Sequence, residues 1–141
     1  MLEIKQPKKE NLQDLLLLLL EFGKEYKDIY PKADVIKVGQ VIEQHFNNGF
    51  ISNAYVNKKL IGSIGALKTE WWFSKEQFVA ETWFYVLPQH RSYKLAKFLI
   101  KELKKYANGM TIQLPTSTGD NNDKLYRKFE FKKMGSIWRY K

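Results

Sequence analysis

Residues 77–96 read QFVAETWFYVLPQHRSYKLA and join an expected strand to an expected helix. Residues 77–87 are rich in β-branched and aromatic side chains, as in a central strand covered on both faces, and Pro88 ends that strand. Apolar residues then recur at helical spacing from Leu95 to Tyr106, until Asn108-Gly109 ends the helix. Because the first N–H groups of a helix are unpaired and its dipole is positive there, this junction predicts an anion site.

The sequence on either side of this junction predicts further strands and helices. Apolar stripes predict helices from Leu12 to Phe22 and from Val35 to Phe46, and Asn57-Lys58-Lys59 predicts the turn of a hairpin. The other expected elements are strands at residues 2–6, 50–56, 60–67, 110–114, 131–134 and 136–140, and a short helix at residues 125–129. The resulting order, β-α-α-β-β-β-α-β-α-β-β, predicts an α/β fold in which helices flank a mixed sheet.

Composition narrows the classes of function. The 141 residues weigh 16.7 kDa, which predicts a single domain over residues 1–141. The 24 basic residues exceed the 15 acidic ones, for a net charge of +9, which favours a polyanionic partner such as nucleic acid or a phosphorylated cofactor. Without cysteine there is no thiolate site, and His45 and His90 lie too far apart in sequence to suggest a metal centre, so we expect no metal.

Six consecutive leucines, Leu15 to Leu20, form the most apolar stretch of the chain. A helix that spans a bilayer needs about 20 apolar residues, so the run is too short to do so. Asp14 and Glu21 bracket the leucines, and no cleavage site for a secretory signal follows them. We therefore expect a buried helix in an intracellular, cytoplasmic protein with no membrane partner.

Two motifs resemble those of the GNAT superfamily of N-acetyltransferases. Residues 86–96 resemble the family's acetyl-coenzyme A signature, Arg/Gln-x-x-Gly-x-Gly/Ala between a strand and a helix: Arg91 and Ala96 match, while Lys94 replaces the first glycine. Residues 125–131, LYRKFEF, resemble the C-terminal block Leu-Tyr-x-x-x-Gly-Phe, with Glu130 in place of the glycine. The family often has an asparagine at the position of Gly119, and its role here falls to Asn121 or Asn122.

The resemblance implies transfer of an acetyl group from acetyl-CoA directly to a primary amine in a ternary complex. It implies that the pantetheine arm pairs with the backbone of Phe84, Tyr85 and Val86. The pyrophosphate then meets the backbone N–H groups of Arg91, Ser92, Tyr93, Lys94, Leu95, Ala96 and Lys97. The Lys94 side chain either reaches the phosphates or points into solvent.

Two side chains are candidates for proton transfer. Glu81 interrupts an uncharged strand, and a buried carboxylate tends to have a raised pKa, so it is the expected base, acting directly or through water. The alternative for Glu81 is a salt bridge to a lysine of a neighbouring strand or a solvated strand end. For Tyr126, the resemblance implies that the hydroxyl protonates the leaving thiolate. The alternative is an ordinary core aromatic.

Other readings stay open. His90 is a rival base but more typical of a surface loop. We expect His45 on an ordinary helix surface, and the alternative is that it faces an acceptor groove. Trp71, Trp72 and Phe73 suit an acceptor pocket, a dimer contact or the core. A basic nucleic-acid-binding domain is disfavoured because it leaves both motifs unexplained, and a non-catalytic coenzyme binder is a third reading. The acceptor is a small-molecule or protein amine, and a homodimer stays open.

Overall fold

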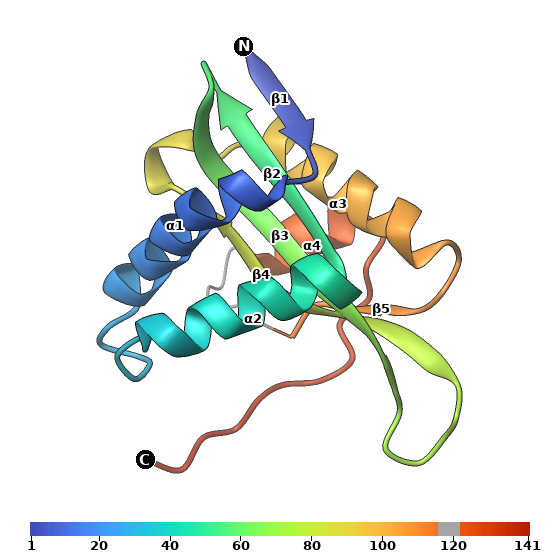
Figure 1. The fold of residues 1–141 in the computed structure, drawn as a ribbon. Coiled ribbons are helices and arrows are strands. Elements are labelled where there is room, and N and C mark those ends of the chain that lie inside the picture. The colour runs from blue at the N-terminus through green and yellow to red at the C-terminus, as the bar shows by residue number, and fades with distance from the viewer. Residues whose placement is uncertain (116–121) are drawn as a thin grey trace.

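The computed structural model describes residues 1–115 and 122–141 and confirms the expected α/β class, a mixed sheet with helices on both faces (Figure 1). The helices are α1 (Leu12–Glu25), α2 (Val35–Asn48), α3 (Tyr93–Ala107) and α4 (Asn122–Lys128). The strands are β1 (Leu2–Lys5), β2 (Phe50–Val56), β3 (Lys59–Glu70), β4 (Gln77–Val86) and β5 (Ile112–Gln113). Short 3₁₀ turns occupy Lys9–Asn11 and Pro88–His90.

The sheet follows the order of the chain, β1-β2-β3-β4-β5. The first four strands are antiparallel, and β5 alone among the described strands runs parallel to its neighbour, β4. That parallel pair requires a crossover, which α3 supplies. Ser92 begins α3 by accepting a hydrogen bond from the Leu95 N–H at 3.1 Å, and Asn108, in the left-handed conformation at φ 48°, ends it.

Two hydrophobic cores lie on opposite faces of the sheet. On one face, α1 and α2 pack through residues such as Leu15 and Ile42, and on the other α3 packs through Leu99 and Leu103. The strand β4 takes part in both: Trp83 and Tyr85 belong to the core of α1 and α2, while Phe84 and Val86 pack with α3. The expectation that this strand is covered on both faces is confirmed.

The leucine run is largely buried, as expected: Leu15, Leu18 and Leu19 are in the core, although Leu17 is exposed. Among the residues that the structure describes, no helix is both long enough and apolar enough to cross a membrane.

The end of the chain differs from the prediction. Strands were expected at residues 131–134 and 136–140, but the structure has no strand in residues 131–141. The N–H of Phe131 donates to Tyr126 O and closes α4, and the chain then leaves the sheet (Figure 1). An apolar pattern makes a strand only when a strand edge pairs with it, and Met134, Ile137, Trp138 and Tyr140 here stay more than 80% exposed.

Candidate active site

Among the residues that the structure describes, β4 is paired on both sides along its first half and on one side along its second. Its parallel pairing with β5 ends at Ala80 and Gln113, whereas its antiparallel pairing with β3 continues to Val86 opposite Gly62. The Leu87 N–H donates to Ile61 O, and backbone groups alternate in direction along a strand. The backbone groups of Val86 and Phe84 therefore face away from β3, along what we call the open edge of β4. By the same alternation, those of Tyr85 face β3.

A register shift lies where the open edge begins. Trp83 pairs with Gly65 and Glu81 with Ala66, so Thr82 is an extra residue in β4. The Trp83 ring lies against Gly65, where any Cβ would come within 2.4 Å of the indole, and its Nε1 donates to Ser63 Oγ at 2.9 Å. These contacts with Gly65 and Ser63 hold the Trp83 indole on the face of the sheet that α1 and α2 cover.

A cavity of about 620 Å³ lies beside this part of β4. Its floor is Thr82, Trp83, Phe84, Tyr85 and Val86. One side, which we call the α1–α2 wall, is formed by Leu19, Phe22, Gly23, Tyr26, Pro31, Ala33, Lys37, Val38 and Val41. The other side, the α3–α4 wall, is formed by Arg91, Ser92, Ala96, Asn122, Leu125 and Tyr126.

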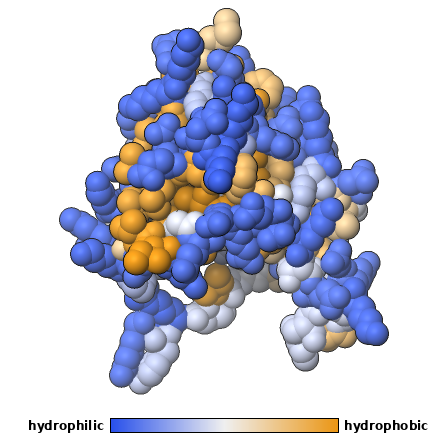
Figure 2. All heavy atoms as spheres, viewed as in Figure 1, coloured by the Kyte–Doolittle hydropathy of each residue, from blue (hydrophilic) through white to orange (hydrophobic). Residues whose placement is uncertain are grey.

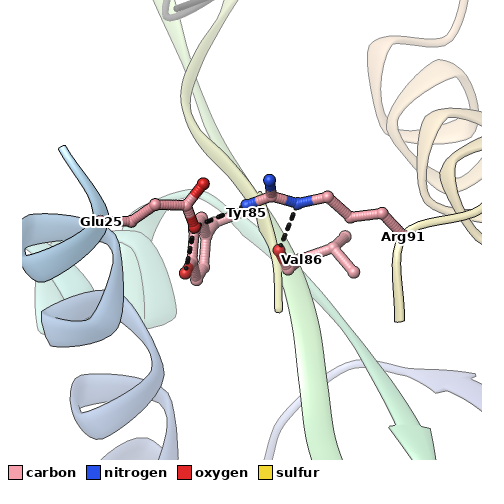
Figure 3. A network of polar contacts seen from close by, with 4 residues as sticks. All are labelled: Glu25, Tyr85, Val86 and Arg91. Carbon is pink, nitrogen blue, oxygen red and sulfur yellow. Dashed lines mark hydrogen bonds and ion pairs between the residues drawn. The ribbon is translucent and has the colours of Figure 1, made fainter. Parts of the chain in front are cut away.

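Arg91 joins the two walls (Figure 3). Its Nε donates to Val86 O at 2.9 Å on the open edge, and its Nη2 donates to Glu25 Oε1 at 2.7 Å, at the end of α1. The Tyr85 hydroxyl donates to the same carboxylate oxygen at 2.8 Å. Burial alone would raise the pKa of Glu25, but the hydrogen bonds from Arg91 and Tyr85 hold that pKa below its usual value. Burial and the Glu25 carboxylate raise the pKa of Tyr85.

The N-terminus of α3 offers fewer free donors than the sequence suggested. Of the N–H groups from Arg91 to Lys97, that of Arg91 donates to Pro88 O, and those of Leu95 and Ala96 donate to Ser92 Oγ and O. Lys97 lies inside the helical hydrogen-bond ladder. Within the described part of the chain, this leaves the N–H groups of Ser92, Tyr93 and Lys94 without an acceptor.

The side chains of this segment point in different directions. Ser92 and Ala96 face the cavity, Leu95 is in the core, and Lys97 is exposed. Tyr93 stacks on Phe129, with ring centroids 5.2 Å apart. Lys94 is exposed and lies beside Leu2, Ile4 and Phe98 at a separate surface hollow rather than in the main cavity. Asn122 lines the main cavity, and Asn121 lies outside the described residues.

Glu81 and Tyr126 lie close enough to interact electrostatically. Burial, and after it the charge of Glu81, raises the pKa of the Tyr126 phenol, which therefore stays protonated at neutral pH. Tyr126 lines the cavity. Glu81 is only 2% exposed and is not among the described residues that line the cavity, so it stands behind the surface that a ligand would touch.

The expected surface position of His45 is wrong. This residue is 1% exposed, and its ring lies 4.7 Å from that of Trp83. Its Nδ1 is 2.7 Å from Val41 O, which makes Nδ1 the donor, so Nε2 accepts from Thr82 Oγ1 at 2.7 Å. Burial lowers the pKa of His45. The residue therefore supports the floor of the cavity from behind.

The aromatic residues 71–73 and His90 lie apart from the cavity lining. Trp71 stacks on Phe78, with ring centroids 4.1 Å apart, whereas Trp72 and Phe73 are exposed. His90 is half-buried in the turn before α3.

Comparison with known proteins decides the family. The model of the acetyltransferase (GNAT) family matches residues 16–131, most of the chain. The chain belongs to the GNAT acetyltransferase family. Its enzyme class is therefore that of the acetyltransferases, as the two sequence motifs implied. No curated protein is significantly similar to it in sequence.

Solved GNAT structures share its fold. A predicted acetyltransferase from Clostridium acetobutylicum, solved with acetyl-CoA, has a TM-score of 0.76 and 16% identity over 100% of this chain and 96% of that one. AAC(6')-Iy, solved with the bisubstrate analogue CoA-S-monomethyl-acetylneamine, has a TM-score of 0.75 and 18% identity, and the match covers 100% of this chain and 97% of that one. The aminoglycoside 6'-N-acetyltransferase AAC(6')-IG of Acinetobacter haemolyticus has a TM-score of 0.72 and 17% identity, and the match covers 99% of this chain and 97% of that one. At these identities the likeness concerns the fold.

Three features of this GNAT site were missed in the sequence. Glu25 is 66 residues from its partner Arg91, and no local pattern joins them. The α1–α2 wall was visible only as an amphipathic stripe, which does not tell a cavity wall from a core. Gly65, a glycine inside a strand, is a known sign of close approach and could have indicated the seat of Trp83.

Proposed function

We propose that this GNAT protein transfers an acetyl group from acetyl-CoA directly to a primary amine in a ternary complex. The observation that carries the proposal is the open edge of β4, which faces the same cavity as the N-terminus of α3. Such an arrangement offers strand-like hydrogen bonds and anion-binding N–H groups to one elongated ligand that carries both amides and phosphates.

The described residues fit the coenzyme in two places. The Phe84 backbone groups and the Val86 N–H on the open edge are suited to the amides of the pantetheine arm, whereas Val86 O accepts from Arg91. The N–H groups of Ser92, Tyr93 and Lys94, which have no acceptor within the described part of the chain, are suited to the pyrophosphate. The Arg91 guanidinium lies against Val86 O on the open edge, with its charge paired to Glu25.

Tyr126 is the proposed proton donor. In the transfer, the amine nitrogen forms a bond to the acetyl carbon, the carbon–sulfur bond breaks with its electron pair on sulfur, and the thiolate takes a proton. Tyr126 lines the cavity and has a raised pKa, so it holds that proton until negative charge develops beside it.

Glu81 is the proposed acceptor of the amine's proton. Because Glu81 stands behind the cavity surface, it acts through water rather than by touching the amine. Its position beside Tyr126 also gives the proton a way back: once Tyr126 has protonated the thiolate, Glu81 can return the proton taken from the amine. The two residues would then be restored together after each turnover.

Melting curves and thiol release test this proposal. Coenzyme A should raise the melting temperature in a concentration-dependent way, and single-stranded DNA of similar charge should not. Acetyl-CoA should then release free thiol only when an amine is present, because direct transfer forms no acetyl-enzyme. Stabilisation by DNA alone would favour the nucleic-acid reading, and coenzyme binding without thiol release for any amine would leave a non-catalytic binder.

A further inference from the structure

The α1–α2 wall is the part of the cavity lining that takes no part in the proposed coenzyme contacts. It is mostly apolar and aromatic: Phe22 on α1, Tyr26 directly after α1, and Val38 and Val41 on α2 line the cavity together with Trp83 and Tyr85 of the floor. The ring centroid of Phe22 lies 5.1 Å from that of Tyr26, and it lies 5.8 Å from that of Tyr85, in an edge-to-face arrangement. Figure 2 shows hydrophobic residues gathered along and between α1 and α2 on this side of the molecule.

The charges around this wall are positive or already paired. Of the described residues that line the cavity, the only ones that carry a charge at neutral pH are Lys37, on the first turn of α2, and Arg91. The Glu25 carboxylate, which pairs with Arg91, is not part of the described lining. It already accepts hydrogen bonds from Arg91 and Tyr85. Within the described lining, no aspartate or glutamate is available to a cationic ligand.

From this combination we propose that the acceptor is an arylalkyl or alkyl primary amine with a single positive charge. This inference rests on the proposed function. An apolar tail gains by burial against the aromatic wall, and aromatic faces also attract one ammonium group. A second ammonium group would have to leave water beside Lys37, and none of the described lining residues offers a carboxylate to receive it. Polyamines and aminoglycosides are therefore poor acceptors, although structural neighbours include aminoglycoside acetyltransferases.

The first experiment compares acceptors on the full chain. Thiol release at saturating acetyl-CoA is measured with 2-phenylethylamine and hexylamine, and with spermidine and kanamycin. Titration calorimetry of each amine into the enzyme saturated with coenzyme A measures binding without transfer. We expect kcat/KM and affinity to be at least about tenfold higher for the two monoamines, the effect of one unpaired charge in a partly desolvated site.

A charge reversal provides the second test. Lys37→Glu places a carboxylate at the rim of the α1–α2 wall, in the first turn of α2, where negative charge suits the helix dipole. It should raise kcat/KM for spermidine relative to 2-phenylethylamine at least about threefold. The control is Lys101→Glu, which makes the same change of net charge on the exposed face of α3. It should leave that ratio unchanged, because a distant surface charge is screened by salt.

The outcomes separate this inference from the proposed function. Preferential binding of monoamines without thiol release would support the acceptor class and refute the transfer. Preferential turnover or binding of spermidine or kanamycin would overturn the acceptor class and leave the transfer intact. Absence of binding by every amine, or an equal shift in Lys37→Glu and Lys101→Glu, would also overturn it.

Discussion

The two sides of the cavity offer a ligand different kinds of chemical group, backbone on one side and side chains on the other. On the side of the open edge and α3, the groups that face a ligand are mostly backbone: the free edge of β4 and the N–H groups of Ser92, Tyr93 and Lys94. On the α1–α2 wall they are side chains. A backbone site survives changes such as lysine at position 94, because the N–H group stays whatever the side chain is. A side-chain site changes with each substitution, so the second wall should set which acceptor binds.

The largest effect is expected from Glu81→Gln, which keeps the shape of the buried side chain beside Tyr126. The amide cannot accept the amine's proton, so the rate on a good acceptor should fall by about 10²- to 10⁴-fold, the range of general base catalysis. Stopped-flow or steady-state thiol release measures it. Coenzyme affinity should hardly change, and an unaltered rate at a pH below the pKa of the amine would contradict a role as base.

Tyr93→Pro tests the backbone side directly. Proline is accepted at the first position of a helix, and Ser92 before it is already extended, so the change removes one N–H group without breaking α3. Losing a hydrogen bond to a charged phosphate should weaken coenzyme A binding by about 10- to 100-fold. Tyr93→Ala is the matched control, because it loses the ring that stacks on Phe129 but keeps the N–H group. Equal affinities of the two variants, measured by calorimetry, would place the phosphates elsewhere.

Tyr126→Phe asks whether the backbone side also contributes one side chain to the chemistry. The ring and its packing stay, and only the hydroxyl is lost, so turnover should fall at least about tenfold with the same melting temperature and coenzyme affinity. A variant that loses stability in proportion to activity would mark Tyr126 as a packing residue.

The smallest expected effect concerns how the stability of the folded protein depends on pH through His45, which lies on the α1–α2 side. Burial lowers the pKa of His45 in the folded protein below its unfolded value, about 6.5. Its contribution to stability is therefore complete above that value and is lost as the pH falls below it, where the unfolded chain binds the proton first. Urea midpoints at pH 7.5 and 5.5 should differ more for the wild type than for His45→Gln, which cannot be protonated. Equal differences in the two proteins would contradict the assignment.

The fold was predictable where the signals are local. The apolar run at residues 77–87, the helical spacing that follows it and the stop at Asn108-Gly109 all depend on neighbours in the sequence. The strand β4, the turn after it and the helix α3 lie where these patterns predict. The last two strands were wrong for the opposite reason. Ile137 and Trp138 have a strand-like pattern, but a strand also requires an edge to pair with, and that depends on the rest of the molecule.

The candidate site was predictable to a similar extent. The strand-to-helix junction identified Arg91 and Ser92, and both line the cavity. Periodicity could not show that the Ser92 hydroxyl accepts the N–H group of Leu95, because capping depends on side-chain geometry. Nor could it show that Arg91 reaches Glu25, since that pair forms only when α1 and the end of β4 come together.

The pairing of β5 has a consequence for how the molecule opens. Two register pairs join β5 to β4 within the described chain, whereas β3 and β4 share nine. Phe129, which follows α4, is buried against α3, and Lys104 Nζ on α3 donates to Phe129 O at 2.7 Å. Native-state hydrogen exchange should therefore find β5 and α4 opening as a unit at lower free energy than the β2–β3–β4 meander. Tyr126 belongs to that unit, so mild denaturant should abolish activity while most of the sheet is still protected from exchange.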